Sequence, residues 1–117
     1  MKTVLIIDDS DILRMTIKEI VTNNGYKVVG EASNGNSGIE KYKELKPDLV
    51  TMDITMDDMD GIDALKQIIR ADAKAKVIVI SAMGQDVVVR DAIMAGAKGF
   101  IVKPFSEQQI MDAFNKP

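Results

Sequence analysis

The sequence predicts an α/β domain of the doubly wound kind, a (βα)5 sandwich with a five-stranded parallel sheet and helices on both faces. Short apolar runs recur five times along the chain, and segments with the apolar spacing of helices separate them. The longest runs are continuous rather than alternating, which is typical of parallel strands buried on both faces. Connections this short require right-handed crossovers, so helices are expected on both sides of an open sheet.

The predicted elements alternate regularly from the first strand to the last helix. The strands are expected at residues 4–7, 28–29, 49–50, 77–80 and 100–102. The helices are marked by apolar residues three or four positions apart, at Leu13, Ile17, Ile20 and Val21, then Ile39 and Tyr42, then Ile62, Leu65 and Ile69, then Val88, Ala92 and Ala95, and finally Ile110, Ala113 and Phe114. Asn24-Gly25 and Gly96 are typical of helix ends, and Ser106 with Gln109 predicts a capping box that begins the last helix.

Composition bounds the function. At 117 residues with 46% hydrophobic content, the chain is expected to form one domain over residues 1–117, as a monomer. Without cysteine or histidine, it has no thiolate chemistry, no histidine-ligated metal and no phosphohistidine of its own. A net charge of -3 without a basic run argues against nucleic acid binding. The first apolar run is too short for a signal peptide or a membrane span, so we expect a cytoplasmic location and no membrane association.

Polar residues follow four of the predicted strands. Asp8 and Asp9 come after the first strand, Asp53 after the third, Ser81 after the fourth and Lys103 after the fifth. Ligands of open α/β sheets bind beyond the carboxyl ends of the strands, so these side chains are expected to meet. Two carboxylates 4 Å apart repel by about 4 kcal/mol near a protein surface, so a cation is needed. Oxygen ligands with room for water favour Mg²⁺ as that cation.

This set of groups predicts phosphoryl transfer. The Asp53 carboxylate is the candidate nucleophile, and its attack on phosphorus gives an acyl phosphate. Lys103 and Mg²⁺ supply positive charge for the phosphoryl oxygens, and the Ser81 hydroxyl with nearby backbone N–H groups supplies hydrogen-bond donors. Because positioning and electrostatics carry such a transfer, neither a histidine nor a general base is required.

These residues resemble the motifs of response-regulator receiver domains, and the resemblance covers essentially the whole chain. The matching pieces are Asp8-Asp9, Asp53, Gly61, Ser81-Ala82 and Lys103-Pro104. The resemblance implies the strand order 2-1-3-4-5, which is known for receiver domains of the CheY type. Within the family, the chain is most similar to chemotaxis regulators of that type, in stretches such as residues 41–48, 51–56 and 81–85.

The resemblance also implies a role for each residue of the site. Asp53 is the expected phosphoacceptor, and Asp9, Asp53 and the backbone carbonyl of Thr55 are expected to ligate Mg²⁺, with Asp8 acting largely through water. Lys103 is expected to pair with the phosphoryl group, and the Ala82 backbone to contact it. A cis peptide bond is implied between Lys103 and Pro104.

The family's switch implies a role for two further residues and for a surface. Ser81 is expected to move toward the phosphoryl group while Phe100 rotates into the vacated space, which shifts an existing equilibrium. The expected output face comprises the fourth helix, fifth strand and fifth helix. The implied partners are a histidine kinase as phosphodonor and, for a chemotaxis regulator, the flagellar motor switch. Such a domain is no enzyme beyond its own phosphoryl transfer and slow self-dephosphorylation.

One residue departs from the family pattern. Asp57 stands where many members have proline, so the loop gains charge beside the metal and loses a φ constraint. We therefore expect a looser loop and an altered Mg²⁺ affinity.

Each residue of the site also has a plain structural interpretation. Acidic residues favour helix N-termini, so Asp8 and Asp9 alone are typical of a helix cap. Asp53 alone is typical of a turn, and Lys103 alone of a solvated surface amine. Only their joint placement favours a binding site. Ser81 as a helix cap and Phe100 as a core ring are equally ordinary, so their switching role rests on the resemblance.

Three other functions remain open at this point. A flavodoxin-type carrier shares the topology but requires a phosphate loop after the first strand, where this chain has acidic residues 8–11 around one serine. A haloacid-dehalogenase-type phosphatase also forms an aspartyl phosphate with Mg²⁺, but it requires an acid two positions after the nucleophile, where this chain has Thr55. The chain also fits a receiver cut from a longer regulator, since Asn115-Lys116-Pro117 is equally typical of a terminus or a linker.

Overall fold

The computed structural model describes residues 1–116, so Pro117, the last position of the expected 1–117 domain, lies outside the described residues. Ten elements alternate along the chain: β1 (Thr3–Ile7), α1 (Asp11–Asn23), β2 (Lys27–Ala32), α2 (Gly35–Leu45), β3 (Leu49–Met52), α3 (Gly61–Ala71), β4 (Val77–Ser81), α4 (Asp86–Met94), β5 (Gly99–Val102) and α5 (Glu107–Asn115). The strands form one parallel sheet in the order β2-β1-β3-β4-β5. The predicted doubly wound α/β sandwich is therefore confirmed.

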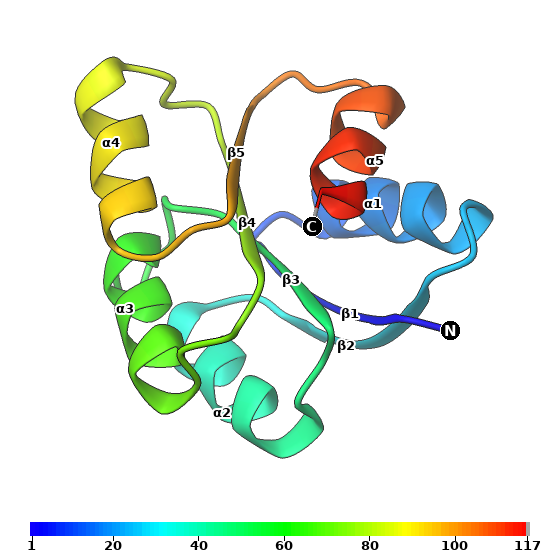
Figure 1. The fold of residues 1–117 in the computed structure, drawn as a ribbon, viewed down its shortest axis with the longest axis horizontal. Helices are drawn as coiled ribbons and strands as arrows, with labels where there is room; N and C mark the ends of the chain where they lie inside the picture. Colours follow the sequence, from blue (N-terminus) through cyan, green and yellow to red (C-terminus); the bar gives the residue numbers. More distant parts are fainter. Residues whose placement is uncertain (117) are drawn as a thin grey trace.

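Two apolar layers hold the helices against the sheet. Helices α1 and α5 cover one face, and α2, α3 and α4 cover the other (Figure 1). Successive residues of β1 serve opposite layers, since Leu5 packs under α2 and α3 whereas Ile6 packs under α1 and α5. Both side chains are fully buried. The continuous apolar runs of the sequence therefore reflect strands covered on both faces.

Local signals set the ends of the helices where the sequence predicts them. Gly25 (φ 89°) and Gly96 (φ 114°) adopt left-handed backbone conformations just beyond α1 and α4, which glycine accepts without a Cβ clash. The capping box of α5 is formed, because the Gln109 N–H donates to Ser106 Oγ and the Ser106 N–H donates to the Gln109 side chain. Within residues 1–116, no helix has both the length and the apolar content needed to cross a membrane.

Strand β2 is longer than the apolar run at 28–29 indicates. Its pairing with β1 continues through Gly30 to Ala32, after a register shift between Val4 and Leu5. As an edge strand with one neighbour, β2 is only partly buried, so it tolerates the polar Glu31 that interrupts the apolar run. Hydropathy alone therefore underestimates the length of this strand.

Candidate functional site

The carboxyl ends of β1 and β3 bring three carboxylates together. Ile7 of β1 pairs with Met52 of β3, so the residues that follow, Asp8 and Asp53, lie side by side. Their carboxylate oxygens and one of Asp9 all lie within 4.8 Å of one another. Asp8 and Asp53 are buried, at 2% and 6% exposure, whereas Asp9 is exposed. The predicted acidic cluster is thus assembled at the sheet edge, open to solvent at Asp9.

Lys103 supplies the positive charge of this cluster. Its Nζ lies 3.3 Å from Asp8 Oδ2 and 3.5 Å from Asp53 Oδ1. The Lys103 backbone N–H donates to the Ser81 carbonyl at 2.8 Å, which fixes the end of β5 against β4. The peptide bond between Lys103 and Pro104 is cis, as the family resemblance implies. One ammonium therefore lies between two buried carboxylates.

Burial and neighbouring carboxylates both disfavour the charged form of Asp53. Burial raises the pKa of Asp53 above its ordinary value, and the neighbouring Asp8 carboxylate raises it further. Lys103 and the Thr55 backbone N–H lower this pKa, but without reversing the net increase. Proximity to Asp9 adds to the increase. A second positive charge at this position relieves the repulsion.

The donor set fits a hard divalent cation. Three carboxylates within 4.8 Å offer only oxygen ligands, and the exposed Asp9 leaves one side open for water. Mg²⁺ prefers oxygen ligands and retains several waters, so this chemistry suits it. Thr55 lies on the exposed loop two residues after Asp53, within the same segment. The residues present are therefore compatible with the expected Mg²⁺.

A glycine allows the loop after β3 to return against the phosphoacceptor candidate. The Gly61 N–H donates to the Ile54 carbonyl at 2.7 Å. A Cβ atom at Gly61 would lie 2.1 Å from the Asp53 carbonyl oxygen, far inside van der Waals contact. Position 61 therefore requires glycine, which explains its place in the matching motif.

The expected switch residues lie on neighbouring strands. Ser81 ends β4 and is 1% exposed, and its Oγ accepts the Met83 N–H at 3.0 Å. Ala82 follows it at an exposed position. Phe100 of β5 pairs with Val79, two residues before Ser81, so the Phe100 ring and the Ser81 side chain point to the same face of the sheet. Phe100 is half-buried against the layer under α3 and α4.

Asp58 is a structural residue that the sequence analysis missed. Its carboxylate accepts the backbone N–H groups of Gly35 at 2.9 Å and Asn36 at 2.8 Å. These two hydrogen bonds lower the pKa of Asp58. They fasten the loop after β3 to the N-terminus of α2, beside the exposed Asp57. The spacing of residues along the sequence does not predict a contact between segments more than twenty residues apart.

Comparison with known proteins agrees with this geometry. The family model of the response regulator receiver domain matches residues 4–115. A chemotaxis protein CheY of Thermotoga maritima is 59% identical over 115 residues, covering 98% of this chain and 96% of the relative. A chemotaxis protein CheY of Bacillus subtilis is 58% identical over 113 residues, covering 97% and 94%.

Solved structures show the same likeness. A chain of the CheX-CheY-BeF3-Mg complex of Borrelia burgdorferi is 39% identical, with a TM-score of 0.94 over 97% of this chain and 86% of that chain. The response regulator domain of Thermotoga maritima CheB is 36% identical, with a TM-score of 0.85, covering 99% and 98%. The chain therefore belongs to the response regulator receiver domain family, as a CheY-type response regulator of two-component signalling.

Proposed function

We propose that this chain is a phosphorylation-activated switch that accepts a phosphoryl group from a histidine kinase on Asp53, with Mg²⁺ bound beside it. The observation that carries the proposal is the placement of Asp53, which is buried beside Asp8 with the Lys103 ammonium between the two carboxylates. A lone buried acid after a strand has no such partners. The proposal treats residues 1–117 as one receiver domain, located in the cytoplasm and acting as a monomer.

The chemistry requires little beyond positioning. An Asp53 Oδ atom attacks phosphorus in line, a new P–O bond forms, and the bond from phosphorus to the donor breaks. With a phosphohistidine donor, the leaving imidazole nitrogen retains the electron pair of the broken P–N bond. Lys103 then pairs with a phosphoryl oxygen, and the Ser81 hydroxyl and the Ala82 N–H donate hydrogen bonds to the others.

The acidic cluster provides the metal ligands. Asp9, Asp53 and the Thr55 carbonyl would ligate Mg²⁺, and Asp8 would support it through water. When bound, Mg²⁺ neutralises charge that builds up on the transferring phosphoryl oxygens. The Borrelia burgdorferi relative was solved with Mg and BeF3, which supports the same ligand chemistry here. Burial, followed by repulsion from Asp8 and Asp9, raises the pKa of Asp53, and a cation beside these carboxylates would relieve that repulsion.

The output is proposed to arise on the α4, β5 and α5 face. Ser81 would leave the Met83 N–H to reach the phosphoryl group, and Phe100 would rotate toward the space vacated. Large apolar side chains already lie 41–57% exposed on or beside α4 and β5, namely Met83, Val87, Ile93 and Val102. Such a surface suits a protein partner. Because the chain is similar to CheY proteins, we propose that this partner is the flagellar motor switch.

A second candidate is a receiver that works as part of a longer regulator. The response regulator VraR of Staphylococcus aureus is 40% identical over 114 residues, and this chain covers only 54% of its length. In that case the α4, β5 and α5 face contacts an attached output domain instead of a separate partner. Under either candidate the chain turns over no external substrate, and its chemistry is limited to its own phosphoryl transfer and slow self-dephosphorylation.

Intact-mass measurement tests the proposal. The full chain is incubated with acetyl phosphate in Mg²⁺, in EDTA, and as the Asp53→Ala variant in Mg²⁺. Glu40→Gln, an exposed substitution on α2, serves as the control for a lost negative charge. We expect one added phosphoryl group in the wild type and the control only. An adduct that persists in Asp53→Ala, or forms equally in EDTA, contradicts the proposal.

A further inference from the structure

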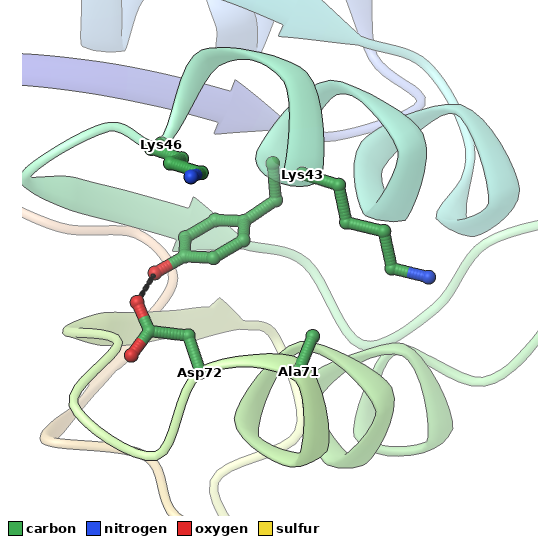
Figure 2. Close-up of a pocket in the computed structure, with 5 residues that line it drawn as sticks. Lys43, Lys46, Ala71 and Asp72 are labelled. Atoms are coloured by element: carbon green, nitrogen blue, oxygen red, sulfur yellow. Dashed lines mark hydrogen bonds between the residues drawn. The ribbon is translucent and has the colours of Figure 1, made fainter.

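The surface between α2 and α3 carries a groove on the face of the molecule that includes neither the acidic cluster nor β5. Three adjoining cavities of about 320, 260 and 320 Å³ form it, and each shares lining residues with the next. Figure 2 shows one end, with Lys43 and Lys46 on the α2 side and Ala71 and Asp72 on the α3 side. The other end is lined by Met59, on the loop after β3. Beyond it, a further cavity shares Asp63 and Lys66 with the groove and is also lined by Asp60 and Asp91.

The groove is a positively charged region on a negatively charged chain. Four cations line it, Lys43, Lys46, Lys66 and Arg70, against the carboxylates of Asp63 and Asp72 alone. The whole chain has a net charge of -3. Within residues 1–116, the ion pairs involve only Arg14, Lys18 and Lys103 as cations. No carboxylate among residues 1–116 therefore lies within ion-pair distance of the four groove cations.

Helix stability accounts for only part of this charge. Lys43 and Arg70 lie in the last turns of α2 and α3, where cations favour the helix dipole. Lys66 lies in the interior of α3. It is three residues after Asp63, an opposite charge that stabilises a helix at that spacing, and four residues before Arg70, a like charge that destabilises it slightly. An anionic ligand in the groove removes this repulsion.

One of the two acidic side chains is already engaged. The Tyr42 hydroxyl donates to Asp72 Oδ2 at 2.8 Å, and this hydrogen bond is the main cause that lowers the pKa of Asp72. Asp72 therefore remains bound to α2 and does not extend across the groove to Lys66 and Arg70. The open positive charge faces solvent along α3.

We propose that this groove binds an acidic, extended segment of a partner protein. Helix α3 has 11 residues, which gives a length of about 16 Å at 1.5 Å per residue. About five residues of extended chain span that length. Carboxylates spaced along such a segment match the cations that α2 and α3 contribute to the groove. The rest of the protein is acidic and repels an acidic segment, which favours binding at the groove. The inference goes beyond the proposed function and does not depend on Asp53.

Fluorescence anisotropy of the full chain tests the inference. The probe is a fluorescein-labelled octapeptide of alternating Glu and Ala, compared with the same peptide carrying Gln in place of Glu. The groove variant Lys66→Gln/Arg70→Gln is matched by Lys27→Gln/Lys98→Gln, which removes the same charge at exposed positions outside the groove. Melting curves check that both variants fold.

We expect the Glu peptide to bind the wild type, with affinity that falls as salt is added. The groove variant should bind about five- to tenfold more weakly, since two exposed ion pairs are lost. The control variant should change by less than about twofold. Amide shifts of labelled protein should move in α2 and α3.

Four outcomes overturn the inference. Equal weakening in both variants shows that only bulk charge matters, and equal binding of the Gln peptide shows that carboxylates are not recognised. A wild type that binds neither peptide at millimolar concentration has no such site. A labelled oligonucleotide that binds the groove when the Glu peptide does not assigns the site to another class of ligand. None of these results bears on phosphorylation of Asp53.

Discussion

Replacing Asp53 with asparagine removes one negative charge from a buried position in the acidic cluster. Carboxylate oxygens of Asp8, Asp9 and Asp53 lie within 4.8 Å of one another, where two charges repel by about 3.5 kcal/mol at an effective dielectric constant of 20. Lys103 Nζ, 3.5 Å from Asp53 Oδ1, offsets one such repulsion by a similar amount. Solvent at the exposed Asp9 weakens the other repulsion.

Burial of the charge is then the deciding contribution. A 6% exposed carboxylate loses several kcal/mol of hydration, and the Thr55 N–H and Lys103 recover only part of it. In the absence of Mg²⁺, we therefore expect Asp53→Asn to increase the free energy of unfolding by about 1–2 kcal/mol. For a domain of this size, that raises the melting temperature by about 3–8 °C.

The effect has a defined pH dependence. The pKa of Asp53 in the folded state is raised above 3.8, so the folded state binds this proton more tightly than the unfolded state. The stability that protonated Asp53 contributes is fully present below pH 3.8 and is lost as the pH rises through the raised pKa of the folded state. The difference between Asp53→Asn and the wild type should therefore be largest at pH 7 and disappear as the pH falls toward 4.

Calorimetric melts in EDTA and in Mg²⁺ measure both effects. Mg²⁺ should stabilise the wild type by mass action and stabilise Asp53→Asn much less, so the difference between them narrows. The control is Glu40→Gln, which changes the charge equally at an exposed site on α2 and should melt within about 2 °C of the wild type. If Asp53→Asn melts at or below the wild type in EDTA at pH 7, the electrostatic account is wrong.

Three further substitutions test other parts of the structure. The buried Thr51 hydroxyl has no hydrogen-bond partner within residues 1–116, so Thr51→Val should raise stability to urea by about 1 kcal/mol; an unchanged or lower value contradicts this. Gly61→Ala places a Cβ 2.1 Å from the Asp53 carbonyl oxygen, so it should lower the free energy of unfolding by about 1–3 kcal/mol. It should also lower the Mg²⁺ affinity measured by titration, and an affinity equal to that of the wild type argues against the tight return of the loop. Tyr42→Phe removes the hydroxyl that lowers the pKa of Asp72, so the variant should be less stable than the wild type at neutral pH and should lose less stability as the pH falls through that lowered pKa. Melting curves of the two proteins that coincide from neutral to acid pH rule this out.

The site was largely predictable from the sequence because its residues follow strands directly. Parallel strands end at one edge of the sheet, so locating an apolar run also locates the side chain after it. Asp8, Asp53 and Lys103 come immediately after the last residues of β1, β3 and β5. The strand order came from the family resemblance, since periodicity alone does not tell which strands are neighbours.

The contacts that the sequence did not predict join distant segments. Asp58 reads locally as one acid among several in the loop, and only the fold brings it to the N-terminus of α2. The α2 and α3 groove likewise depends on the packing of two helices whose cations, considered separately, are ordinary surface residues. The expectation that Asp57 loosens this loop remains a prediction, and Asp57→Pro with Mg²⁺ titration and melting curves tests it.

Locating the phosphoryl group within the chain tests whether Asp53 is the phosphoacceptor. The wild type is phosphorylated with acetyl phosphate in Mg²⁺ and reduced with borohydride, which converts an aspartyl phosphate to homoserine, and the peptides are sequenced by mass spectrometry. We predict homoserine at position 53 and aspartate at positions 8 and 9. Homoserine at another carboxylate, or a phosphorylated chain that borohydride leaves unchanged, contradicts the assignment of Asp53 as the phosphoacceptor.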